Sequence, residues 1–138
     1  MLFSKTNTPD HLSVGKRGED TAARFYKKKH YKILERNHRA SRYETDLIVA
    51  DKQTIVFVEV KTRCYADIDA LDVQRPSKAI DYSKKQFLIY AARQYLKQHP
   101  KEKRNPRIDV IEIYLDDNPN VKKKKILKIN HIPNAFGK

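Results

Sequence analysis

The sequence predicts one α/β domain whose helices flank a mixed central sheet. Its 138 residues suffice for one hydrophobic core but not for two. The stretch from Thr54 to Arg63 is a nearly continuous run of β-branched and aromatic side chains, which is typical of a strand buried on both faces. A helical pattern between the third and fourth expected strands implies a crossover connection, and hence a parallel strand pair within the sheet.

The first expected helix spans Ser13 to His30. Its buried side is marked by residues that recur at helical spacing, namely Val14, Gly18, Ala22 and Phe25. Residues 1–12 precede this pattern, and we expect this terminal segment to be loose. Glu19 lies close to the first turns of the helix, where the helix dipole favours a carboxylate.

Three strands are expected next, at residues 31–37, 44–50 and 54–63, with a basic turn at residues 38–42. The polar residues 51–53 have the length of a hairpin connection between the second and third strands. Residues 64–76 show no clear periodicity of apolar side chains, and we expect them to form a loop. Because this loop directly follows the central strand, it is a candidate flap over a substrate.

The rest of the chain is expected to add one helix and two strands. The helix runs from Ser77, or from Asp81 acting as N-cap, to Gln98. A strand at residues 107–115 completes the core, and residues 116–120 form a dense turn signal. Residues 121–132 predict a lysine-rich edge strand, charged as edges tend to be, so residues 116–138 form an extra basic edge strand and tail.

Two carboxylates are expected to face each other across the central hairpin. With residues 52–53 as a two-residue loop, the pairing places Asp46 opposite Glu59; a loop centred on residues 51–52 makes the pair diagonal, and only an odd-length loop separates them. Like charges in this position destabilise the ladder by roughly 0.2–1 kcal/mol. A divalent cation bound between the two carboxylates would make their proximity favourable, and Mg²⁺ prefers sites with one or two carboxylates. The alternative is a carboxylate pair at the surface whose mutual repulsion is reduced by the positive charge of Lys61.

The charge balance indicates a polyanionic partner. The chain has 30 Lys and Arg residues against 17 Asp and Glu residues, which gives a net charge of +13. The basic residues are spread along the chain, as in a folded domain with a charged face. Nucleic acid is the commonest partner for such a surface.

Other features narrow the class of protein. Cys64 is the single cysteine, which excludes an internal disulfide and suits a reducing cytoplasm. No apolar stretch approaches the ~20 residues of a membrane span, and the N-terminus has no signal-peptide core. The five histidines lack ligand spacing, so a zinc site is not expected. The oligomeric state is left open, a homodimer being one option.

Several motifs between Gly15 and Ile113 together resemble the bacterial YraN family. They are Gly15-x-x-Gly18-Glu19-Asp20, Tyr31-x-Ile33-Leu34-x-x-Asn37, Asp46-Leu47-Ile48, Phe57-Val58-Glu59-Val60-Lys61-Thr62-Arg63, Lys84, Ala91-Ala92-x-x-Tyr95-Leu96 and Asp109-Val110-Ile111. The chain has Tyr43-Glu44-Thr45-Asp46 where the family usually has Gly-Glu-Ile-Asp. That family is described as a predicted endonuclease akin to archaeal Holliday-junction resolvases, so the resemblance implies a restriction-endonuclease-like αβββαβ core.

The resemblance also implies the residues of a nuclease site. Asp46, Glu59 and Lys61 fall on the Asp…Glu-x-Lys motif, and Glu19 falls on the helix-borne acidic residue that completes it. Gln86-Phe87-x-x-Tyr90 is similar to the Gln-containing helix motif of some related nucleases.

The chemistry expected from these residues is metal-assisted hydrolysis of DNA phosphodiesters. Asp46, Glu59 and the Val60 carbonyl would hold Mg²⁺, or Mn²⁺ as a substitute, which would polarise the phosphate and acidify a bound water. Lys61 would orient or deprotonate that water and stabilise the developing charge. Further DNA contacts are expected from Thr62, Arg63, Lys84 and Gln86. Branched or junction DNA in repair or recombination is the expected substrate, and a non-catalytic basic nucleic-acid-binding module is the competing hypothesis.

Overall fold

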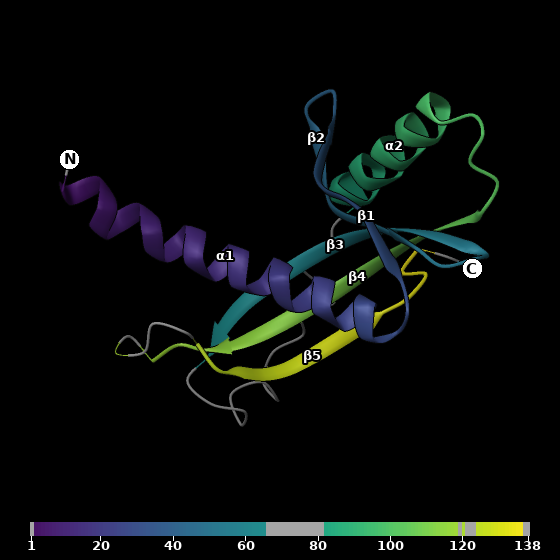
Figure 1. Cartoon of the computed structure of the whole chain (residues 1–138). Coiled ribbons are helices and arrows are strands. Elements are labelled where there is room, and N and C mark those ends of the chain that lie inside the picture. The colour runs from purple at the N-terminus through teal and green to yellow at the C-terminus, as the bar shows by residue number, and fades with distance from the viewer. Residues whose placement is uncertain (1, 66–81, 119, 121–123, 137–138) are drawn as a thin grey trace.

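The computed structural model describes residues 2–65, 82–118, 120 and 124–136, with backbone alone for residues 2–13. Figure 1 shows how the elements follow one another along the chain. They are α1 (Leu2–Lys28), β1 (Lys32–Ala40), β2 (Tyr43–Ala50), β3 (Thr54–Tyr65), α2 (Tyr82–Gln98), β4 (Asn105–Asp116) and β5 (Ile126–Ile132). The α/β class and the order of the core elements are therefore as the sequence predicts.

The five described strands form one mixed sheet in the order β1-β2-β3-β4-β5. Only β3 and β4 pair in parallel, and the other neighbouring strands are antiparallel. The parallel pair is the one that α2 connects, which is the geometry that a crossover helix requires. The prediction of a mixed sheet is confirmed. Strand β5 lies at the edge of the sheet, but Lys128 is its single lysine, so the lysine-rich part of the expected strand is not in β5.

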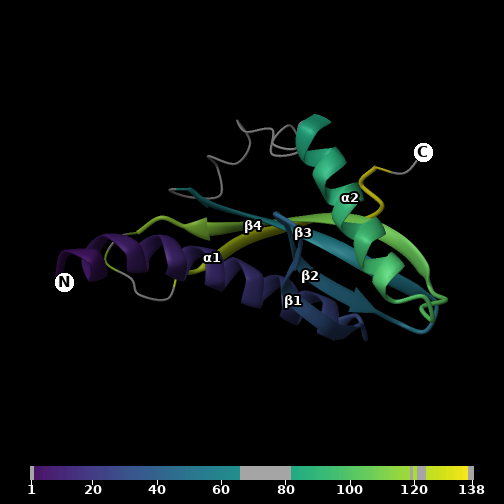
Figure 2. The same ribbon diagram turned by 90° about the horizontal axis from the view of Figure 1, so that it is seen from above.

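One helix packs on each face of the sheet, as the two views in Figures 1 and 2 show. Successive strand side chains point to opposite faces. On β3, Val56 and Val58 therefore join the core cluster formed with α1, whereas Ile55 and Phe57 join the cluster formed with α2. By the same alternation Glu59 belongs to the α2 face of the sheet.

The boundaries of several elements differ from those expected. Helix α1 begins at Leu2 rather than Ser13, so the segment expected to be loose is part of the helix. The apolar spacing that marks the buried side begins only at Val14, and the pattern therefore did not reveal the preceding turns. Strand β5 is shorter than expected, and β3 continues through Tyr65. Most of the expected flap and the N-cap Asp81 lie outside the described residues.

The hairpin between β2 and β3 has the register that a two-residue loop predicts. Ala50 pairs with Ile55, and the Asp51 N–H donates to the Thr54 carbonyl at 3.0 Å. The Asp51 Oδ1 atom accepts hydrogen bonds from the backbone N–H groups of Gln53 and Thr54, at 2.9 and 2.8 Å. This carboxylate cap satisfies the turn's own donors and so fixes the loop length.

Gly18 sets how closely α1 approaches the end of β3. A Cβ atom built on Gly18 would overlap the side chain of Thr62, whereas one on Gly15 would meet nothing. Overpacking of this kind costs about 1–3 kcal/mol. Gly18 is therefore explained by contact with the sheet, and this contact places the second half of α1 over the strand that carries Glu59.

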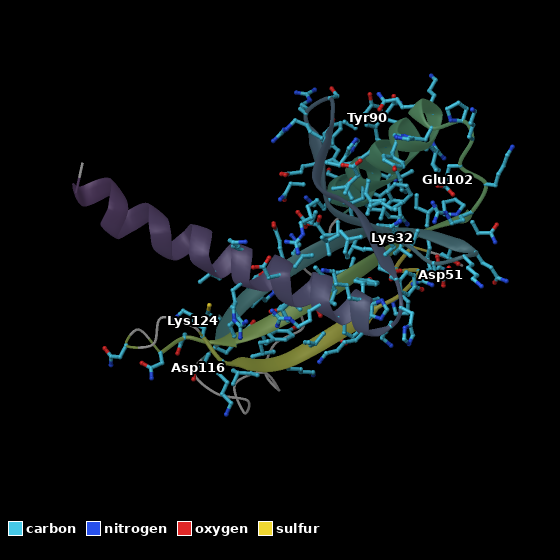
Figure 3. All side chains as sticks on the ribbon, in the orientation of Figure 1. Lys32, Asp51, Tyr90, Glu102, Asp116 and Lys124 are labelled. Atoms are coloured by element: carbon cyan, nitrogen blue, oxygen red, sulfur yellow. The ribbon has the colours of Figure 1, made fainter. Side chains whose placement is uncertain are left out.

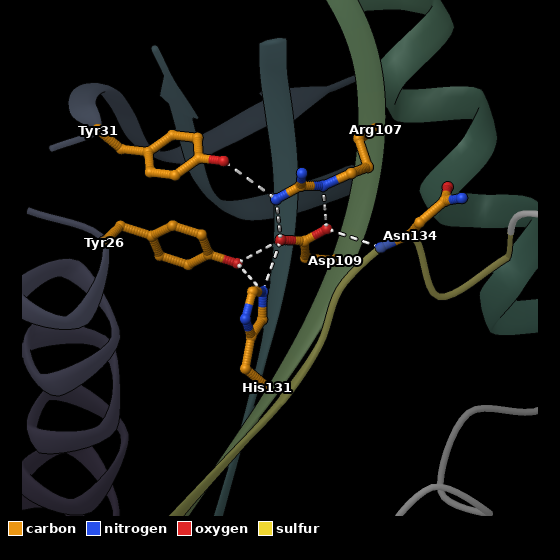
Figure 4. Close-up of polar contacts among 6 residues, drawn as sticks. All are labelled: Tyr26, Tyr31, Arg107, Asp109, His131 and Asn134. Carbon is orange, nitrogen blue, oxygen red and sulfur yellow. Dashed lines mark hydrogen bonds and ion pairs between the residues drawn. The ribbon is translucent and has the colours of Figure 1, made fainter. Parts of the chain in front are cut away.

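A polar network centred on Asp109 joins α1, β4 and β5 on the α1 face (Figure 4). The carboxylate is 0 % exposed. It accepts hydrogen bonds or ion pairs at 2.7–3.0 Å from the Tyr26 hydroxyl, the Arg107 guanidinium, His131 Nε2 and the Asn134 backbone N–H. Burial alone would raise the pKa of Asp109, but these donors outweigh it and hold the pKa well below its usual range. The network therefore depends on an ionised Asp109.

We predict that Asp109→Asn lowers the free energy of unfolding by about 3 kcal/mol near neutral pH, because removing one partner leaves a buried charge uncompensated. The folded-state pKa lies below the unfolded value of about 4. This contribution is therefore fully present above about pH 4 and is lost as the pH falls toward the folded-state pKa.

Urea unfolding of wild type and variant across this acidic range measures the difference. The gap between the two proteins should narrow on acidification. Asp117→Asn, at an exposed carboxylate, should differ from wild type by less than about 0.5 kcal/mol. A gap that is independent of pH would contradict the assignment of the effect to the Asp109 charge.

Candidate functional site

A cleft of about 510 Å³ lies where β2, β3 and the first turns of α2 meet. We call it the carboxylate cleft, because Asp46, Glu59 and Glu44 line it together with Val60. Basic and aromatic residues form the remaining wall, namely Arg39, Arg42, Tyr43, Lys84 and Phe87. The three candidate metal ligands from the sequence, Asp46, Glu59 and Val60, thus line one concave, mostly polar site.

The strands separate at this cleft because of Asp46. The β2–β3 ladder extends from Ala50↔Ile55 to Leu47↔Val58, and continuing its register by one residue places Asp46 opposite Glu59. At this position the Val60 N–H donates to Asp46 Oδ2 at 2.7 Å instead of to the β2 backbone. The side chain therefore ends the ladder, and the cleft opens beyond it.

The environment of Asp46 disfavours its charge. Burial, followed by the negative charge of Glu59, raises the pKa of Asp46 to about 7, although the hydrogen bond from Val60 lowers it. The charges of Glu19 and Glu44 add smaller effects in the same raising direction. The cross-strand repulsion expected from the sequence is therefore present at this position.

Glu59 is almost fully buried, at 4 % exposure, and two lysines balance its charge. Lys61 Nζ and Lys84 Nζ lie 3.4 and 3.2 Å from the same carboxylate oxygen, Oε2. Lys61 comes from β3 itself and Lys84 from the start of α2. The helix on this face thus supplies a second cation beside the Glu-x-Lys pair.

The oxygen donors of the cleft suit a hard divalent cation. Two carboxylates at adjacent strand positions are the set that Mg²⁺ uses when water and phosphate complete its shell. Asp46 and Glu59 would hold the ion, and Val60 is the residue between Glu59 and Lys61 that also lines the cleft. Among the described residues, no group of three or more His, Cys, Asp and Glu side chains is arranged for metal binding. Such an ion would therefore depend on these two carboxylates.

Most of the other predicted site residues do not line the carboxylate cleft. Glu19 is on α1, does not line the cleft and affects Asp46 only through its charge. Thr62 packs against Gly18 on the α1 face. Arg63 pairs in register with Tyr114 on β4, and its Nε atom is buried with no hydrogen-bond partner among the described atoms. Lys84 lies in the cleft, and Gln86 lines a neighbouring groove.

The arginines of the cleft were not predicted as site residues. Arg39 and Arg42 come from the tip of the β1–β2 hairpin, which the sequence marks only as a basic turn. Tyr43 and Phe87 hold this tip against α2, with stacked rings whose centroids are 4.5 Å apart. The contact depends on where α2 crosses the sheet, and no local spacing in the sequence encodes it.

Together these features define a basic α/β domain in which a buried glutamate and a half-buried aspartate share a cleft with basic side chains. The model of the uncharacterised protein family UPF0102 matches residues 18–113. The chain therefore belongs to UPF0102, the YraN family that its motifs resemble.

Relatives in several bacteria match most of the chain. A UPF0102 protein of Caldanaerobacter subterraneus subsp. tengcongensis is 42% identical over 124 residues, which cover 90% of this chain and 94% of that protein. A UPF0102 protein of Chlorobium phaeobacteroides is 39% identical over 89% of this chain and 93% of its own length. One of Caldicellulosiruptor saccharolyticus is 40% identical over 89% and 96%. These names give the family and no activity.

Within the described part of the chain, neither helix has the length and apolar character needed to cross a membrane.

We predict that Asp46→Asn changes the response of the protein to divalent cations. In metal-free buffer the variant should be neutral or more stable than wild type by up to about 1 kcal/mol, because the cross-strand repulsion is removed. The asparagine oxygen can still accept the Val60 hydrogen bond. With a cation at a hundredfold excess over its Kd, wild type should gain ~2.7 kcal/mol and the variant much less.

Thermal melting in EDTA, Mg²⁺ and Ca²⁺ measures both effects. Asp117→Asn is the control, because it removes an aspartate charge at an exposed position that does not line the cleft and should keep the full metal response. Equal metal responses of wild type and Asp46→Asn would show that Asp46 is not a ligand. The pair would then be structural.

Proposed function

We propose that the protein is a metal-dependent endonuclease that hydrolyses DNA phosphodiester bonds, with branched or junction DNA in repair or recombination as its substrate. The observation that carries the proposal is the pair Asp46 and Glu59, which face each other at the point where β2 and β3 separate. Lys61 accompanies this pair, and Arg39, Arg42 and Lys84 line the same cleft. Carboxylates for a cation and basic groups for a phosphate are the two parts that phosphodiester hydrolysis needs.

Each group in the cleft then has a role. Asp46 and Glu59 hold Mg²⁺ or Mn²⁺, which when bound polarises the phosphate and lowers the pKa of a water molecule. Lys61 orients or deprotonates the attacking water and stabilises the negative charge that develops on the phosphate. Lys84, Arg39 and Arg42 contact phosphates of the substrate backbone.

The ion pairs that Glu59 forms with Lys61 and Lys84 are consistent with this mechanism for the protein without substrate. Both ammonium groups lie beside Glu59 Oε2 and neutralise a carboxylate that is otherwise buried. A cation held by Asp46 and Glu59 would supply positive charge to the same carboxylate, and Lys61 Nζ would then contact the water and the phosphate. The ion pairs therefore keep the catalytic groups close together before the substrate arrives.

The same ion pairs favour a second function, that of a non-catalytic DNA-binding module. In that case Glu59 is a structural carboxylate whose charge Lys61 and Lys84 satisfy, and the arginines of the cleft bind the DNA backbone. Incubation of purified protein with branched, flap, nicked and linear DNA in Mg²⁺, Mn²⁺ or EDTA distinguishes the two functions. Metal-dependent products define the enzyme, and binding without products defines the module.

We predict that Lys61→Ala abolishes cleavage but retains most of the affinity for DNA. One phosphate contact among several carries little of the total binding, whereas Lys61 acts on the water and on the developing charge. Single-turnover cleavage and equilibrium binding in Ca²⁺ measure the two effects separately.

The matched control is Lys52→Ala, at the exposed hairpin turn at the opposite end of β3. It removes the same charge and should cut at the wild-type rate. If Lys61→Ala also cuts at that rate, Lys61 is not catalytic and the motif assignment fails.

We predict that DNA binding depends strongly on salt and little on sequence, because the net charge of +13 acts on the phosphate backbone. For ~6 phosphates contacted, the affinity should fall on the order of a thousandfold between ~50 and ~200 mM salt. Titrations of two unrelated sequences at several salt concentrations measure this slope. A nearly flat log-log plot would contradict backbone recognition.

A further inference from the structure

A second hollow continues from the carboxylate cleft along α2. It has a volume of about 630 Å³, and we call it the aromatic groove. The tip of the β1–β2 hairpin forms one wall and α2 forms the other, and in Figure 3 the labelled Tyr90 lies between them. Three residues line both hollows, namely Arg42, Tyr43 and Phe87. The two hollows are therefore adjacent, with these three residues between them.

The groove presents aromatic rings to solvent. Phe87 and Tyr90 are each 41 % exposed, an unusual state for large apolar side chains on a helix that is otherwise packed on a sheet. Tyr43 stacks on Phe87 with an interplanar angle of 17°, and Tyr90 meets Tyr43 edge to face at 5.3 Å. These contacts hold the rings in fixed orientations, so a planar ligand does not have to order them on binding.

The groove is also cationic. Arg42 and Arg93 line it, and Arg42 lies over the Tyr43 ring with its Cζ atom 5.8 Å from the ring centroid. None of the described residues that line the groove is acidic. Rings combined with arginines form the platform on which unpaired bases stack while the phosphates are neutralised. A second copy of the chain would bring its own charge of +13 to this surface, which disfavours that occupant.

We propose that the aromatic groove binds unpaired nucleotides of the DNA substrate by stacking their bases on Phe87 and Tyr90. In duplex DNA the base faces are covered by neighbouring pairs, so the groove selects a single-stranded flap, gap or junction arm beside the cleaved phosphate. The substrate class is therefore DNA with a single-stranded segment next to a duplex. The proposal rests on the proposed function, since the phosphate of the same strand occupies the carboxylate cleft.

The test is a binding titration in EDTA, where no cleavage occurs. The probes are a single strand of about six nucleotides carrying 2-aminopurine, a blunt duplex, and that duplex with a single-stranded overhang. Phe87→Leu and Tyr90→Leu keep apolar bulk but lose the ring. Each should weaken binding of the single strand and the overhang about tenfold, within the range of one stacked base, and change duplex affinity less than about twofold.

Two controls separate stacking from damage to the fold. Tyr82→Leu removes a ring that is 75 % exposed on the same helix but does not line the groove, and it should leave all affinities unchanged. Phe87→Trp restores a larger stacking face and should restore single-strand binding together with the quenching of 2-aminopurine fluorescence. Loss of binding that Phe87→Trp does not recover would overturn the proposal.

Other outcomes also decide the question. Equal losses on duplex and single strand, or no loss at all, would overturn the stacking site. A wild-type dimer in sedimentation that Phe87→Leu converts to a monomer, without any change in DNA affinity, would also overturn it, because the groove would then be a protein interface.

The proposed nuclease activity is tested separately, by cleavage in Mg²⁺. If wild type cleaves DNA but Phe87→Leu binds it as tightly as wild type, only the groove proposal is overturned. If binding depends on the rings but wild type does not cleave, only the proposed catalysis is overturned.

Discussion

The register of the β2–β3 hairpin is the constraint on which the candidate site depends. The turn closes with Asp51 Oδ1 accepting hydrogen bonds from the backbone N–H groups of Gln53 and Thr54, and this loop length brings Asp46 level with Glu59. A slip of one residue would move every β2 side chain to the other face of the sheet. The buried alternation of β2 and β3 on two helix-covered faces opposes such a slip, so the core itself holds the two carboxylates together.

The two helices pack on the two faces of this sheet in different ways. Helix α1 packs closely on one face, where Gly18 meets Thr62 and the Asp109 network joins the helix to β4 and β5. Helix α2 covers only part of the other face. Its first turns approach the end of β3 and bring Lys84 to Glu59, while its exposed rings face the hairpin tip. The α1 face therefore supplies the rigid support, and the α2 face is where the chain can meet a ligand.

The sequence is sufficient to predict what depends on local spacing. The strands of the core, both helices, the parallel β3–β4 pair and the facing of Asp46 and Glu59 follow from periodicity, crossover length and loop length. The arginines at the hairpin tip and the partnership of Lys84 with Glu59 do not, because they depend on how α2 crosses the sheet. Glu19 shows the same limit, since helical spacing gives its side of α1 but not its distance from Asp46.

Burial of two carboxylates at neighbouring positions has a cost that the molecule offsets in two different ways. Glu59 keeps two ammonium groups within 3.4 Å, whereas burial and the charge of Glu59 raise the pKa of Asp46 and so favour its neutral form. The charge of Glu59 is thus balanced by one lysine from β3 and one from α2. Because Lys84 reaches Glu59 only when α2 packs on this face of the sheet, the balance of charge in the cleft depends on the same packing that forms the cleft.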